Sequence, residues 1–75
     1  MARVASARAG SLVGSIRPGE PDARLELQQL FDGGWQTIGF ARLRRDRSYA
    51  AALPGPGLFR IALGDMAGPA VRIGG

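Results

Sequence analysis

The densest group of residues that could do chemistry is a run of four arginines around Asp46, namely Arg42, Arg44, Arg45 and Arg47. A guanidinium group binds carboxylates and phosphates through paired hydrogen bonds, so Arg42, Arg44 and Arg45 are candidate contacts for an anionic polymer. Arginines at the end of a strand also form solvated faces that protect a sheet edge against association. Both interpretations stay open at the level of the sequence.

The single tryptophan, Trp35, is a second candidate for a surface contact. On the outer face of a sheet its ring could stack on a sugar, and Gln28 and Thr37 would then lie close enough to offer hydrogen bonds. A tryptophan beside a hairpin turn can equally be a packing residue. We therefore group Trp35 with Arg42, Arg44 and Arg45 as candidate contacts for an anionic polymer or glycan.

Binding of nucleic acid would need aromatic platforms between basic residues. In the relevant part of the chain these are Trp35, Phe40, Tyr49 and Phe59. A small core requires at least two of them, so few are left to meet bases. A small nucleic-acid-binding β-barrel is therefore kept only as the last of the alternatives.

The chain contains no cysteine, histidine or lysine. This excludes thiol nucleophiles, imidazole general bases, thiolate or imidazole zinc ligands and Schiff-base chemistry. The six acidic residues are scattered, and Pro21 separates the closest pair, Glu20 and Asp22. The serines have no neighbouring base to activate them. We expect no enzymatic activity and no catalytic, cofactor-binding or metal-binding residue in this chain.

At 75 residues the chain has room for one domain with a single thin core. Its net charge of +4 rests on ten arginines, and a composition so rich in arginine, alanine and glycine reflects a GC-rich genome as readily as selection for anion binding. Residues 1–14 lack the apolar run of a signal peptide. No stretch approaches the roughly 20 apolar residues that span a bilayer.

Short runs of alternating apolar residues, separated by glycine, proline, aspartate and serine, predict an all-β fold. We expect one antiparallel sandwich or barrel of about seven short strands over residues 1–75, with residues 1–9 as a weak edge strand or a linker. The segment from Arg17 to Pro21 is an expected loop. The expected strands are Arg3–Ala7, Ser11–Ile16, Ala23–Phe31, Trp35–Leu43, Arg47–Leu53, Leu58–Leu63 and a last short one with Val71 and Ile73.

The clearest hairpin joins the third and fourth of these strands at a Gly-Gly pair. A two-residue turn at Gly33 and Gly34 leaves Leu30 and Trp35 on the outer face near the tip. The side chains that this register sends to the core are Leu25, Leu27, Ile38 and Phe40. A three-residue loop beginning at Asp32 would instead set an aromatic pair, Phe31 and Trp35, opposite each other.

Several of these positions form a series of motifs, which are Leu25-x-Leu27-Gln28, Gly34-Trp35-x-x-Ile38, Tyr49, Pro54-x-x-Gly57-x-Phe59-Arg60-Ile61 and Gly68-Pro69-Ala70-Val71-x-Ile73. Together they resemble the immunoglobulin-like or fibronectin-type repeats that trail many exported bacterial proteins. The resemblance covers roughly residues 11 to 73. It departs from the repeats where Arg45-Asp46-Arg47-Ser48 replaces a turn that ends in glycine, and where Phe59 replaces a tyrosine.

The resemblance implies an all-β, immunoglobulin-like antiparallel β-sandwich of about seven short strands, and a role beside other domains rather than a reaction. Such repeats are appended to cell-wall-acting proteins, including ones similar to sporulation stage II protein D, amidases and peptidases. We therefore expect a non-catalytic accessory or spacer module of a larger exported bacterial protein, extracellular or at the cell surface, whose partners are the neighbouring domains. The alternative is an adhesive module that binds an anionic cell-wall polymer or glycan through Trp35, Arg42, Arg44 and Arg45.

Overall fold

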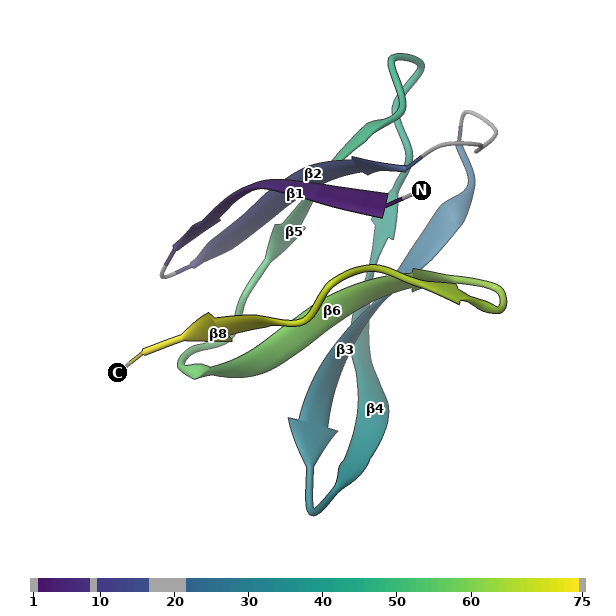
Figure 1. The fold of residues 1–75 in the computed structure, drawn as a ribbon. Helices are drawn as coiled ribbons and strands as arrows, with labels where there is room; N and C mark the ends of the chain where they lie inside the picture. The colour runs from purple at the N-terminus through teal and green to yellow at the C-terminus, as the bar shows by residue number, and fades with distance from the viewer. Residues whose placement is uncertain (1, 9, 17–21, 75) are drawn as a thin grey trace.

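The computed structural model describes residues 2–8, 10–16 and 22–74, and within them the chain is all-β (Figure 1). Seven of the strands match the predicted ones to within one or two residues at each end, and the two-residue β7 was not predicted. The predicted loop from Arg17 to Pro21 lies outside the described residues. The strands are β1 (Ala2–Arg8), β2 (Ser11–Ile16), β3 (Arg24–Phe31), β4 (Gly34–Arg42), β5 (Ser48–Ala52), β6 (Gly57–Leu63), β7 (Met66–Ala67) and β8 (Val71–Ile73).

The strands form two antiparallel sheets stacked as two layers (Figure 1). One sheet has the order β1-β2-β5, and the other has the order β4-β3-β6-β7 with β8 also paired to β6. The chain changes sheet between β2 and β3, again between β4 and β5, and again between β5 and β6. The predicted antiparallel β-sandwich is therefore confirmed.

The core lies between the sheets and follows the period-two pattern of the strands. In β2, Leu12 and Ile16 are buried, and their neighbours along the strand are half-buried. In β5, Tyr49 and Ala51 are buried, and in β6, Phe59 and Ile61 are buried, since each strand sends alternate side chains to one face. The core consists of Leu12, Ile16, Leu25, Leu27, Leu43, Tyr49, Ala51, Leu53, Phe59, Ile61 and Ile73.

The β3–β4 turn uses Asp32 and Gly33, which both have positive φ, at 48° and 81°. This is the geometry of a two-residue hairpin turn whose twist suits the strands. Phe31 then pairs with Gly34, and Leu30 pairs with Trp35. The predicted turn at Gly33–Gly34 and the alternative three-residue loop are both wrong, because aspartate tolerates the left-handed conformation well enough to take the first turn position.

A β-bulge at Ile38 changes the facing of β4 beyond it. Gln28 pairs with Thr37, but the next residue of β3, Leu27, pairs with Gly39. The extra residue reverses the alternation, so the predicted placement of Phe40 in the core is wrong. Phe40 lies on the outer face with 58% of its surface exposed, and Ile38 is 38% exposed.

Candidate functional site

Trp35 lies on the outer face of the β4-β3-β6 sheet, opposite Leu30 of β3. It is half-buried, because the guanidinium carbon of Arg60 lies 4.3 Å from the centroid of its ring. Arg60 comes from β6, two strands away from Trp35, so the two side chains meet above β3. The tryptophan is therefore neither a core residue nor a bare stacking platform, since one of its faces carries a cation.

A hydrogen bond to Gln28 holds Arg60 in this position. Its Nε donates a hydrogen bond of 2.7 Å to Oε1 of Gln28, which is its cross-strand neighbour on β3. On the other side of Gln28, Thr37 donates its hydroxyl to a carboxylate oxygen of Glu26. The polar groups that were expected beside Trp35 are present, and both are already hydrogen-bonded within the sheet.

A second pair of a cation and an aromatic ring lies on the same outer face, toward the other end of β4. The guanidinium carbon of Arg24 is 4.5 Å from the centroid of the Phe40 ring. Arg24 is paired across the ladder with Arg42, and both are exposed. Nη1 of Arg42 donates a hydrogen bond of 3.4 Å to the carbonyl oxygen of Asp22. The bulge at Ile38 creates this second pair, because it turns Phe40 outward.

The predicted contact residues are only partly brought together. Trp35 and Arg42 share the outer face, but they stand seven residues apart on one strand, which corresponds to roughly 20 Å. Arg44 and Arg45 are exposed in the connection between β4 and β5, beyond the end of the strand. Together the four residues mark the two ends of an extended face rather than one compact site.

Three residues of this face, Arg24, Phe40 and Arg60, were not predicted as contacts. Arg60 is far from Trp35 in the sequence, and only the order and register of β4, β3 and β6 place it over the ring. Phe40 was missed because the bulge is not visible in the alternation. A basic residue at the outer position of β6 is the one signal that sequence reasoning could have used.

The connection between β4 and β5 is fixed by its own hydrogen bonds. The carboxylate of Asp46 accepts bonds of 2.9 Å from the backbone N of Ser48 and 2.6 Å from its hydroxyl. These bonds, with a smaller effect of Arg44, hold the pKa of Asp46 below its usual value of 3.8. Arg47 takes positive φ, at 67°, so this turn adopts the left-handed conformation without a glycine. In β5, the strand that follows this turn, burial raises the pKa of the Tyr49 hydroxyl.

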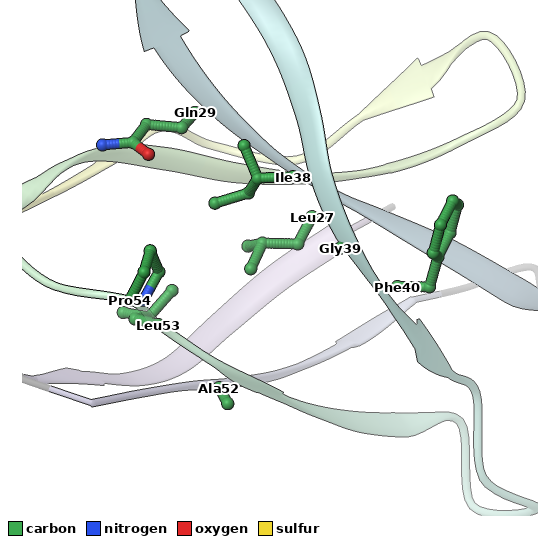
Figure 2. A pocket seen from close by; sticks show the side chains of 8 residues that line it. All are labelled: Leu27, Gln29, Ile38, Gly39, Phe40, Ala52, Leu53 and Pro54. Carbon is green, nitrogen blue, oxygen red and sulfur yellow. The ribbon is translucent and has the colours of Figure 1, made fainter.

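An open apolar groove of about 480 Å³ lies on the inner side of β4, between the edges of the two sheets (Figure 2). Its walls include Leu27 and Ile38 from one sheet, and Leu53 and Pro54 after β5. Figure 2 shows the ring of Phe40 set apart from these side chains. Gln29 is the polar side chain at the groove, and it packs against Gly57, where an added Cβ would lie 2.4 Å from its amide nitrogen.

Within the described ranges, no three acidic side chains gather into a group that could hold a metal ion. No helix among those residues is long and apolar enough to span a membrane. No protein-family model, curated protein or solved structure matches the chain.

Proposed function

We propose that this chain is a non-catalytic accessory module of a larger exported bacterial protein, working outside the cytoplasm or at the cell surface. The observation that carries the proposal is its interior. In the part of the chain that the structure describes, every buried side chain is apolar apart from the Tyr49 hydroxyl, and no buried charged group is present. Such a core supports a rigid two-layer block, because nothing in it is set aside for a reaction or an internal ligand.

The mechanism of such a module is positional. A sandwich with a close-packed core keeps its shape, so it holds a neighbouring domain at a fixed distance from the polymer on which that domain acts. The likeness of the Leu25-x-Leu27-Gln28 and Pro54-x-x-Gly57 motifs to repeats of exported proteins supports this role.

The test is a domain exchange in the full-length protein. Replacing these 75 residues by an unrelated β-sandwich of similar size should preserve the activity of the neighbouring domain on its polymer, whereas replacing them by a flexible linker should lower it. If the unrelated sandwich lowers the activity as much as the linker does, the spacer role is refuted, because specific contacts of this chain would then be required.

The outer face of the β4-β3-β6 sheet favours a second candidate function, which is adhesion to an anionic polymer. The guanidinium groups of Arg24 and Arg60 both lie over aromatic rings there, and Arg42 adds a further positive charge. A solvated face that served solubility alone would not need its arginines to be oriented by ring stacking. Under this candidate function the module anchors its neighbour by binding and not by length alone.

A further inference from the structure

We propose that the outer face formed by Arg24, Trp35, Phe40 and Arg60 binds a linear polysaccharide that carries carboxylates at intervals along a hydroxyl-rich chain. We call these four residues the cation–aromatic face. The inference rests on the second candidate function and names the class of ligand for it. It uses a different set of residues from the arginine cluster in the β4–β5 connection.

The two guanidinium groups are already oriented for binding. The Arg60 guanidinium lies over the Trp35 ring, and its Nε donates a hydrogen bond to Gln28, so two contacts hold it in place. Arg24 is stacked on Phe40. Among the described residues, neither arginine forms an ion pair with a carboxylate. A guanidinium group that is already held in place loses little side-chain entropy when it binds a carboxylate through two hydrogen bonds.

The spacing of these groups calls for a ligand with separated charges. Arg24 and Gln28, the residue that holds Arg60, stand four positions apart on β3, which corresponds to roughly 14 Å. Glu26 lies between Arg24 and Gln28 on β3, and its carboxylate accepts a hydrogen bond from Thr37. A carboxylate at that point repels a dense run of anionic groups, but it accepts hydrogen bonds from hydroxyls.

The same arrangement disfavours single-stranded nucleic acid. Its bases need open ring faces for stacking, and its phosphates recur at every nucleotide. Here each of the two rings, Trp35 and Phe40, carries a guanidinium on one face. Glu26 stands where an intermediate phosphate would lie. A polysaccharide with a carboxylate on every second sugar meets both arginines and places its hydroxyls over Glu26 and Thr37.

The proposal is tested by titrating the full chain with hyaluronate oligosaccharides and following the emission of Trp35. Since this is the single tryptophan and Arg60 lies on its ring, we expect a saturable change in emission. Binding should weaken with salt, because it depends on exposed charges. Arg24→Gln and Arg60→Gln should each lower the affinity about tenfold or more, as expected for loss of a paired charged hydrogen bond.

The matched control is Arg45→Gln, which removes the same charge from the exposed β4–β5 connection and should change the affinity less than about threefold. Arg60→Lys keeps the charge but loses the planar fork, so it should bind nearly as weakly as Arg60→Gln. Far-ultraviolet circular dichroism establishes that each variant is folded.

Four outcomes would overturn the proposal. They are no saturable binding, equal binding of neutral dextran, tighter binding of single-stranded DNA, and an equal loss of affinity in Arg45→Gln. None of them affects the spacer proposal, which the domain exchange tests separately. An unrelated sandwich that preserves activity together with saturable hyaluronate binding would show that this face binds without being needed for positioning.

Discussion

The placement of Phe40 and Phe59 on opposite faces of the second sheet leads to a sharp prediction about stability. Phe59 has no exposed surface and belongs to the core between the sheets. Truncation of Phe59 to alanine removes a fully buried ring and leaves a cavity, so Phe59→Ala should cost about 3 to 5 kcal/mol. A chain of this length has a total stability of about 4 to 11 kcal/mol, so the variant should be close to unfolding.

Phe40→Ala is the matched control, because it makes the same chemical change at a residue that is 58% exposed. Its main loss is the contact with the Arg24 guanidinium, which is worth about 0.5 to 1 kcal/mol at an exposed site. We therefore expect a cost of about 1 kcal/mol. The two variants should differ by at least about 2 kcal/mol.

The measurement is urea unfolding of both variants, followed by far-ultraviolet circular dichroism and by Trp35 emission. Coincidence of the two probes establishes two-state behaviour, and an unchanged slope with urea shows that the change lies in stability. If Phe40→Ala costs as much as Phe59→Ala, Phe40 is a core residue and the bulge at Ile38 is refuted. A cost below about 1 kcal/mol for Phe59→Ala would refute the core itself.

Two further predictions concern backbone and pH. Gly57→Ala should destabilise the fold by about 1 kcal/mol or more, because Gly57 has a φ of 156°, which residues with a Cβ rarely adopt, and because the added Cβ would lie 3.2 Å from Cζ of the buried Phe59 ring. Gly55→Ala, which meets nothing within 4 Å, is the control in the same urea assay. The pKa of Asp46 is lowered in the folded state, so its contribution to stability is present above its usual value of 3.8 and is lost as the pH falls through the lowered pKa. The difference in urea midpoint between the natural chain and Asp46→Ala should therefore shrink on acidification below 3.8, and a constant difference would contradict the role of the Ser48 hydrogen bonds.

The positions of the strands could be predicted because two independent signals coincide. Turn residues such as Pro54 and Pro56 mark where strands cannot continue, and alternation shows which residues face the core. In β5 and β6 the two signals agree, and the alternating residues Tyr49, Phe59 and Ile61 are buried. β7 was missed because two residues, Met66 and Ala67, are too few to show a period.

The β3–β4 hairpin shows where this reasoning stops. From the turn to Gln28 and Thr37, the facing is that of the predicted two-residue turn, with Trp35 outside. Beyond the bulge, the pairing of Leu27 with Gly39 is the one that the three-residue loop would give. The facing of β4 thus agrees with the predicted two-residue turn before Ile38 and with the three-residue loop after it. A bulge inserts a residue without altering the composition of the strand, so the alternation alone did not reveal it.

The contact face could not be predicted for a related reason. Its two pairs join β4 to β6 and β4 to β3, so they depend on strand order and on register together. Sequence reasoning reached Trp35 and Arg42, which stand out by residue type. It did not reach Arg60, because an isolated arginine at an outer strand position is an ordinary surface residue until its neighbour across β3 is known.

The bulge at Ile38 connects the groove and the cation–aromatic face to a single residue. Continued without the bulge, the pairing of Gln28 with Thr37 would set Ile38 opposite Leu27 and Phe40 opposite Leu25, both on the inner face. With the bulge, Gly39 occupies the inner position opposite Leu27 and has no side chain to fill the space, so the groove stays open there. The ring that would have filled the interior stands outside, where Arg24 stacks on it. The bulge thus removes the Phe40 ring from the core at the edge of one sheet and places it on the surface, where it orients the Arg24 guanidinium. Such an exchange lowers the stability of a small domain, and this cost supports the proposal that the cation–aromatic face binds a ligand.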